Sequence, residues 1–362
     1  MKKVLLALVL ALGLVACGEK TESPKENEKP VVKIGAIFPL SGATSTEANE
    51  LKEAMQVIVS DLNDTANVKY ELIFEDSVGG AAAKGVLAAQ KLAQYDKVNI
   101  IYSIFSDVAK AIMPIVEQNE IVQIGVVANL PTFSGGLNFQ NFALPEYEAE
   151  RLLDYVQKQN IKNIVAFVNT MSGELARYNS FEKLAKEKDI NVKKYEIVRG
   201  NRNFDIDIYK AMEDKPDAFL LILAMPELDI LGKSLKNKGI DIPVLAMEAI
   251  AFSENKSLFE NAVYTNINMK SEILNDIKKR ANINGEMGLL QIYDSLSLIN
   301  NIINKYVDEH KKIPSGQELA KLISDFREFK GTANIVEIKN NKFINKYVLQ
   351  QIVNGQPVAV EE

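Results

Sequence analysis

The feature that most constrains this fold is a regular alternation of short apolar runs with longer amphipathic runs between residues 31 and 246. The first apolar run, 31–38, is typical of a strand, and residues 49–63 then repeat apolar side chains at helical spacing. Strands separated by helices of this length require parallel sheets that are covered by helices on both faces. The pattern therefore predicts an α/β protein. Further strands are expected at 70–74, 98–104, 121–128, 163–168, 192–198, 218–224 and 242–246.

The alternation falls into two blocks, which predict two doubly wound parallel-sheet lobes. The tail does not repeat the unit, because it consists of two expected helices followed by two expected strands around the turn Asn340-Asn341. Such a tail fits a chain that returns to the first lobe and finally crosses back to the second. The helices are expected at 286–306 and 314–326 and the strands at 335–339 and 343–352. The expected first lobe comprises 31–145 and 268–340, the second comprises 146–267 and 341–362, and three crossings near 145, 267 and 341 form a hinge.

The amino terminus has the layout of a removable secretory leader. Two lysines precede an apolar run of about a dozen residues, which is too short for a membrane span of about 20 residues. Cys17, the only cysteine, stands at the expected cut and is followed by Gly18, an arrangement that resembles a bacterial lipobox. That resemblance implies cleavage after residue 16, lipidation of Cys17 and anchoring to a bacterial membrane, either in the periplasm or at the cell surface. The alternatives are a buried free cysteine and a short membrane anchor. The polar segment 17–30 is expected to be a disordered tether.

Composition excludes several classes of function. Without the leader, 346 residues remain, the net charge falls from −6 to −8, and the charges are interspersed, so no nucleic-acid partner is expected. A lipidated Cys17 leaves no thiol for a disulfide or a metal site. The single histidine, His310, lies in a charged helix end, which argues against a multi-histidine metal site and against a catalytic triad. We therefore expect neither an enzyme nor a metal or other cofactor.

Several segments resemble the type I periplasmic binding proteins for branched-chain amino acids. The run 33–42 (KIGAIFPLSG) looks like the opening of that family, and 74–76 (FED), 88–92 (AAQKL) and Tyr293-Asp294 follow in the family's order. The resemblance implies two lobes joined by three strands that close on a small ligand. It also implies a monomer that delivers an amino acid or similar solute to an ABC permease with a cytoplasmic ATPase.

Candidate ligand contacts follow from the rule that open α/β sheets bind ligands at the carboxyl ends of their strands. The hydroxyl-rich segment 41–46, with Ser41 and Thr46, follows the first strand, although it also fits an ordinary polar turn. Ser106 lies between a strand and a helix, where it can bind a ligand carboxylate or simply cap the helix. Glu248 follows another apolar strand, and a solvated surface position is the alternative.

The resemblance assigns roles to these and other positions. It implies that Ser106 contacts a ligand carboxylate, helped by a backbone group of Val127 and by Asn129, where the family has a hydroxyl. An asparagine in an ordinary turn is the alternative for Asn129. Glu248 matches the acid that pairs with the ligand ammonium. The family also places aromatic residues at Thr46, near Ser172 and near Ala224, where this chain has none. The pocket wall is therefore expected to be reshaped.

Three functions remain open from the sequence. The first is a ligand-binding lipoprotein of an amino-acid importer. The second is a sensory or assembly lipoprotein of the same fold without a transport role, which the lack of aromatic residues at the expected wall positions favours. The third is an extracytoplasmic enzyme. The lack of a nucleophile–base pair in the sequence argues against it.

Overall fold

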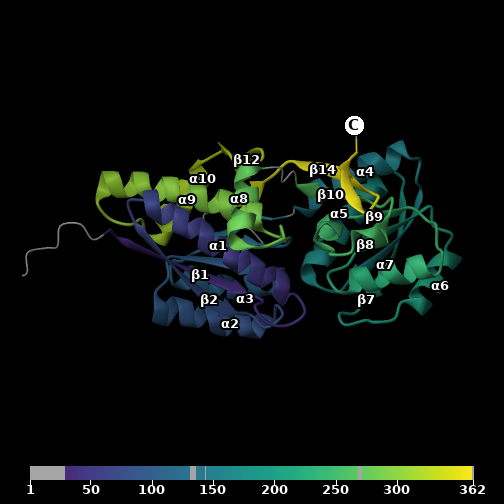
Figure 1. Ribbon diagram of the computed structural model, residues 1–362, viewed down its shortest axis with the longest axis horizontal. Helices are drawn as coiled ribbons and strands as arrows, with labels where there is room; N and C mark the ends of the chain where they lie inside the picture. The colour runs from purple at the N-terminus through teal and green to yellow at the C-terminus, as the bar shows by residue number, and fades with distance from the viewer. Residues whose placement is uncertain (1–28, 131–135, 143, 268–270, 361–362) are drawn as a thin grey trace, which may run out of the picture.

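A computed structural model describes residues 29–130, 136–142, 144–267 and 271–360. The chain forms two α/β lobes that lie side by side along the longest axis (Figure 1). The described carboxyl-terminal strands belong to the second lobe, whereas the described chain begins in the first. The expected leader, Cys17 and nearly all of the expected tether lie outside the described residues.

The first lobe is built on an eight-stranded sheet in the order β11-β12-β13-β5-β4-β3-β1-β2. β1 (Val31–Phe38) pairs in parallel with β2 (Lys69–Asp76) and β3 (Ile100–Ile104), and β4 (Val122–Val126) and β5 (Asn138–Gln140) continue the parallel part. The edge is a meander of β11 (Glu328–Lys330), β12 (Ile335–Lys339) and β13 (Lys342–Ile344).

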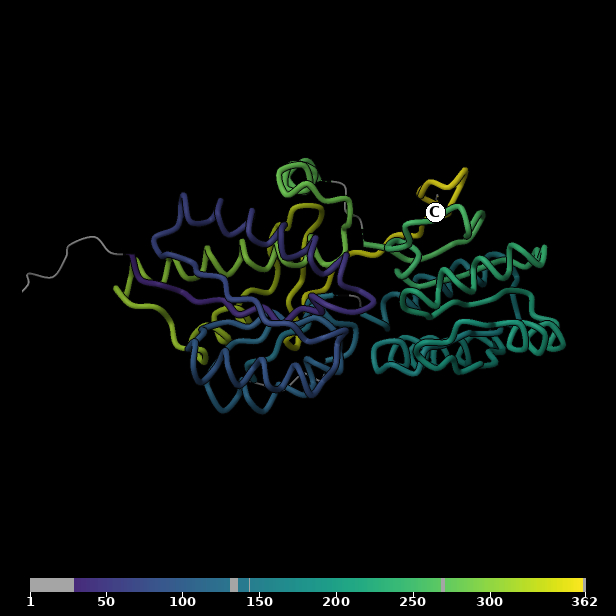
Figure 2. Tube along the Cα trace, turned by 60° about the horizontal axis from the view of Figure 1, so that its bottom comes forward, coloured from purple at the N-terminus to yellow at the C-terminus, as the bar shows by residue number. Residues whose placement is uncertain are grey.

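Helices cover both faces of this sheet, as parallel strands require. α1 (Ser45–Thr65), α8 (Glu272–Ala281), α9 (Leu289–His310) and α10 (Gly316–Asp325) lie on one face, and α2 (Ala82–Gln90) and α3 (Ser106–Gln118) lie on the other (Figures 1 and 2). β1 illustrates this covering of both faces. Ile34, Ala36 and Phe38 pack into the core beneath α1 and α9, whereas Ile37 packs beneath α2 and α3. A strand buried on both faces reads as a continuous apolar run rather than as an alternation.

The second lobe has a seven-stranded sheet in the order β15-β14-β10-β9-β8-β6-β7. Its parallel part comprises β6 (Asn163–Asn169), β7 (Asn191–Ile197), β8 (Ala218–Ile222), β9 (Val244–Ala246) and β10 (Val263–Ile267). β14 (Tyr347–Val353) and β15 (Gln356–Ala359) add antiparallel strands. α4 (Pro145–Lys158) and α5 (Ser172–Glu187) cover one face, and α6 (Asp205–Glu213) and α7 (Glu227–Asn237) cover the other.

The carboxyl-terminal tail differs from the expected division at one point. The single strand expected at 343–352 is two strands, and β13 still belongs to the first sheet, so the third crossing follows Ile344 instead of residue 340. The reason is the tight turn at Asn340 and Asn341, both of which have positive φ. This turn folds β13 back onto β12 in an antiparallel hairpin, which keeps it in the sheet that contains β12.

The first and third crossings are joined by one tyrosine. The Tyr347 hydroxyl accepts a hydrogen bond of 2.6 Å from the backbone N–H of Leu144 and donates one of 3.5 Å to the carbonyl of Phe142. Tyr347 and Leu144 are both buried, so water does not replace these partners. The two segments that connect the lobes therefore share a buried polar contact at the hinge.

We expect Tyr347→Phe to lower the free energy of unfolding by about 1–3 kcal/mol, because it leaves the buried N–H of Leu144 without an acceptor. Denaturant unfolding followed by circular dichroism measures this change. Tyr209→Phe is the matched control, because Tyr209 is 67% exposed. Equal stabilities of the two variants would show that the hinge does not depend on the Tyr347 hydroxyl.

Candidate ligand-binding site

A cavity of about 140 Å³ lies between the lobes, at the carboxyl ends of both parallel sheets. In the first lobe, strand order reverses between β1 and β3, and the cavity is lined by residues that follow them, such as Thr44 and Ser106. In the second lobe the order reverses between β6 and β8, and the cavity is lined by residues that follow those strands, such as Met171 and Ala224. Ligands of open α/β sheets bind at such reversal points.

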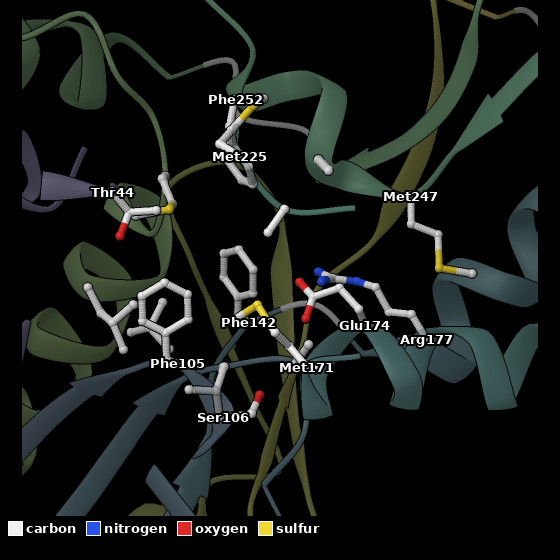
Figure 3. Close-up of a pocket in the computed structure, with 18 of the residues that line it drawn as sticks. Thr44, Phe105, Ser106, Phe142, Met171, Glu174, Arg177, Met225, Met247 and Phe252 are labelled. Carbon is white, nitrogen blue, oxygen red and sulfur yellow. The ribbon is translucent and has the colours of Figure 1, made fainter. Parts of the chain in front are cut away.

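The cavity wall is largely apolar. Phe105, Phe142 and Phe252 contribute aromatic rings (Figure 3), and the Phe142 ring stacks on the Phe252 ring with centroids 6.3 Å apart. None of these phenylalanines lies at the three positions where the family resemblance implied an aromatic residue. Four methionines, Met171, Met225, Met247 and Met287, complete the wall. Methionine side chains adapt to irregular apolar ligands.

The junction between β3 and α3 holds a strained residue at the cavity. Phe105 precedes the first helical residue, Ser106, and has a φ of 70°, which a bulky side chain rarely adopts. Such backbone strain is typically found at functional sites, where the surrounding structure holds it in place. Here it turns the Phe105 ring to the cavity wall and places Ser106 at the amino terminus of α3, beside its free backbone N–H groups.

The lobes contact each other directly at one edge of the cavity. The amide Nδ2 of Asn129 donates a 3.2 Å hydrogen bond to the carbonyl of Ser172, and the backbone N–H of Asn129 donates one of 3.1 Å to Ser106 Oγ. Gly173 lies so close that a Cβ there would be 3.2 Å from Ser106 Oγ. The start of α5 in the second lobe is therefore packed against the start of α3 in the first.

The structure places the expected ligand contacts in different surroundings. Ser106, Val127 and Ala224 line the cavity, and the Asn129–Ser172 hydrogen bond borders it. Thr46 lies instead in an adjoining polar cleft of about 880 Å³. The Ser41 hydroxyl donates a 2.6 Å hydrogen bond to Asp76, which ties it to the end of β2. The roles proposed for these residues toward a ligand stay predictions.

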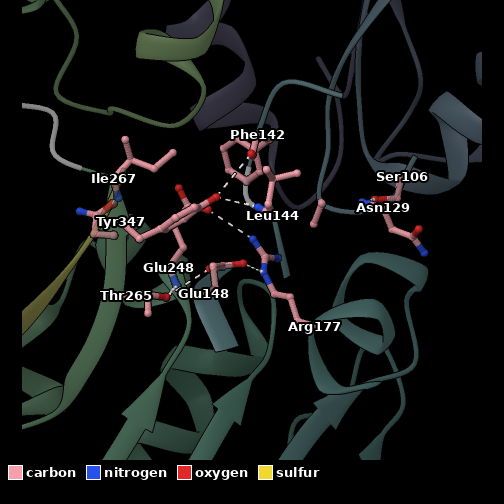
Figure 4. Close-up of polar contacts among 12 residues, drawn as sticks. Ser106, Asn129, Phe142, Leu144, Glu148, Arg177, Glu248, Thr265, Ile267 and Tyr347 are labelled. Atoms are coloured by element: carbon pink, nitrogen blue, oxygen red, sulfur yellow. Dashed lines mark hydrogen bonds and ion pairs between the residues drawn. The ribbon is translucent and has the colours of Figure 1, made fainter. Parts of the chain in front are cut away.

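Glu248 is buried next to the cavity and is paired within the protein. Arg177 Nη2 lies 3.3 Å from one Glu248 oxygen, and Arg177 Nε donates a 2.9 Å hydrogen bond to Glu148 (Figure 4). The Thr265 hydroxyl donates to the second oxygen of Glu148 at 3.2 Å. The sequence left a solvated surface position open for Glu248, whereas the structure buries it beside Arg177. A contact between Glu248 and a ligand ammonium stays a prediction.

Burial has a clear effect on the acids around Arg177. Burial and, to a smaller extent, the neighbouring negative charge of Glu148 raise the pKa of Glu248 to about 8, although the attraction of Arg177 opposes both effects. Burial also raises the pKa of Glu174, again against the attraction of Arg177. One guanidinium thus faces three carboxyl groups, so carboxyl groups outnumber cations in this part of the site.

Sequence reasoning missed Glu174, Arg177, Phe142 and Phe252. Glu174 and Arg177 occupy the first two turns of α5, and their place after β6 was a usable signal, since strand ends are where ligands bind. Phe142 and Phe252 lie in the first crossing and in the 3-10 helix η2 (Glu248–Phe252), and no periodic pattern marks either segment.

The chain belongs to the periplasmic binding protein family, whose family model matches residues 31–260. No curated protein sequence matches the chain. Among the described residues, the helices are all too short or too polar to cross a membrane.

Solved structures with the same architecture include several solute-binding proteins. The leucine-binding protein LivK of Thermotoga maritima has a TM-score of 0.79 at 19% identity, over 91% of this chain and 98% of that one. A solute-binding protein of an ABC transporter from Rhodopseudomonas palustris BisB5, in complex with 3,4-dihydroxybenzoic acid, has a TM-score of 0.78 at 17% identity, over 91% and 96%. LivJ of Streptococcus pneumoniae, in complex with isoleucine, has a TM-score of 0.77 at 15% identity, over 91% and 98%. At these identities the likeness shows the fold.

We expect Arg177→Met to lower the free energy of unfolding by about 3–5 kcal/mol, because Glu148 and Glu248 would remain buried without a cation. Chemical denaturation measures the change. Arg280→Met is the control, since Arg280 pairs with Asp61 at the surface, where an ion pair contributes about 0–1 kcal/mol. A loss for Arg177→Met no larger than the loss for Arg280→Met would contradict this account.

Proposed function

We propose that this chain is a lipid-anchored solute-binding protein, which captures an amino acid or similar small ligand between its lobes and delivers it to an ABC importer. The observation that carries the proposal is the apolar cavity at the strand-order reversal points of both lobes. A ligand there contacts both lobes at once, so its binding free energy favours the closed arrangement. No catalytic role is proposed, and the protein acts as a monomer.

Ser106 is the proposed anchor for a carboxylate. Its hydroxyl already accepts a hydrogen bond from the Asn129 N–H, which leaves the hydroxyl hydrogen available for a ligand. The amino terminus of α3 adds free backbone donors and a favourable dipole. Val127, Ala224 and Thr44 line the same cavity and shape it around the rest of the ligand.

The second candidate function is a sensory or assembly lipoprotein of the same fold without a transport role. One observation favours it, namely the direct contact between the lobes through Asn129, Ser172 and Gly173. Such a contact stabilises one arrangement of the lobes without any help from a ligand. A partner protein that recognises this arrangement then requires no transported solute.

Ligand screening tests the proposed function. The panel contains amino acids, small peptides and organic acids, because the similar structures include a leucine-binding protein and a complex with a dihydroxybenzoic acid. A ligand at 100 times its dissociation constant stabilises the native state by about 2.7 kcal/mol, which raises the melting temperature measurably. We expect the best ligand also to lower the radius of gyration in X-ray scattering. A panel without any stabilising compound would contradict solute binding.

The proposed anchor is tested separately. We expect Cys17→Ser to yield unprocessed or soluble protein, because the thiol is the proposed site of lipidation. Membrane fractionation and mass spectrometry of the amino-terminal peptide measure this. Ser23→Ala in the proposed tether is a control that leaves the cysteine intact. An unmodified Cys17 in membrane-bound natural protein would rule out the lipid anchor.

A further inference from the structure

The charged side chains that line the cavity are mostly acidic. Glu47 and Asp107 come from the first lobe and Glu174 comes from the second, whereas Arg177 is the one cation among the described lining residues. The Glu174 carboxylate lies beside the cavity, between Phe142 and Arg177 in the close-up (Figure 3). The electrostatic character of the site therefore depends on whether Arg177 is available to a ligand.

Arg177 is already committed to the protein. Its Nε donates to Glu148 at 2.9 Å and its Nη2 lies 3.3 Å from Glu248, and both acids are almost completely buried. The buried Glu148 carboxylate already balances the charge of Arg177, which therefore has little attraction left for an anion. An anionic ligand placed beside it would also meet Glu174, and like charges repel strongly where water is excluded.

Polar atoms without a partner occur on the opposite wall. Thr44 Oγ1 and Glu47 Oε2 are buried and have no hydrogen-bond partner among the residues that the structure describes. Both residues line the cavity from the start of α1. Across the cavity, the Glu174 carboxyl group feels the charge of Arg177. Buried polar atoms such as Thr44 Oγ1 and Glu47 Oε2 are costly unless a hydrogen-bond partner meets them.

We propose that the cavity selects ligands with an ammonium group on an apolar body, and that Glu174 and Glu47 recognise the ammonium from opposite lobes. This inference rests on the proposed function of the cavity as a solute site. The apolar body contacts the methionines, and the faces of Phe105, Phe142 and Phe252 add favourable cation–π attraction. Organic acids without an ammonium group are excluded by the same carboxylates. The proposal moves cation recognition from Glu248 to Glu174, because Glu248 is already paired with Arg177.

Matched triads of small compounds test the inference by calorimetry on the natural protein. Each triad keeps one carbon body and changes only the head group: isopentylamine, isopentanol and isovalerate form one triad, and benzylamine, benzyl alcohol and benzoate form the other. We expect the cation to bind most tightly and the acid most weakly in every triad that binds. An acid that binds more tightly than its cation, or a set in which no cation binds, would overturn the inference. The proposed function would stand if the wider ligand screen still found a stabilising compound.

Variants then locate the recognition. We expect Glu174→Gln to weaken binding of the best cation by at least about tenfold, which corresponds to the loss of one charge-assisted contact. The neutral alcohol of the same triad should bind both proteins equally. Glu187→Gln is the matched control, since it makes the same change at the exposed end of the same helix. Glu47→Gln should act in the same direction as Glu174→Gln. Unchanged affinity of Glu174→Gln for the cation would remove Glu174 from the site.

Discussion

A single, largely buried guanidinium, that of Arg177, organises the second lobe beside the cavity. Arg177 on α5 bonds Glu148 on α4 and pairs with Glu248, the first residue of η2, and Thr265 on β10 bonds the far side of Glu148. Four segments that are distant in the sequence thereby meet at one buried cation. Because buried charges are tolerated only when they are paired, each of these side chains depends on the others to remain inside the protein. The end of the second sheet is fixed where it borders the cavity.

The hinge lies against the same region. Tyr347 begins β14 directly after the third crossing, and its hydroxyl bonds the backbone of Leu144 and Phe142 in the first crossing. Phe142 also presents its ring to the cavity, where it stacks on Phe252. A group that fills the cavity therefore touches a residue whose own carbonyl is held by the hinge. The cavity wall and the hinge thus share Phe142.

Much of the fold could be predicted because parallel strands buried on both faces are short apolar runs that stand out in a sequence. β1 was predicted over the whole of its length, and the two-lobe α/β architecture followed from the alternation. Elements with weaker patterns were missed. Only Leu274 and Ile277 of α8 are buried, and β5 has just three residues with a polar one at each end. The expected strand at 343–352 was wrong in extent, since apolar periodicity does not show where a chain leaves one sheet for another.

The site was less predictable, because its properties arise from residues that meet only in space. Burial of Glu248 could be inferred from its place after an apolar strand, but its partner Arg177 lies 71 residues away. The absence of aromatic residues at three expected positions indicated a different wall. It could not indicate that Phe105, Phe142 and Phe252 supply the rings instead, since the last two lie in segments without periodicity.

The charges around the cavity were equally hard to predict from the sequence. In the sequence, Glu174 resembles any exposed acid in the first turn of a helix. Only the structure shows that the nearby Arg177 contacts Glu148 and Glu248 instead of pairing with Glu174. The proposed electrostatic preference of the cavity thus depends on a set of residues that are far apart in the sequence and meet only in the fold.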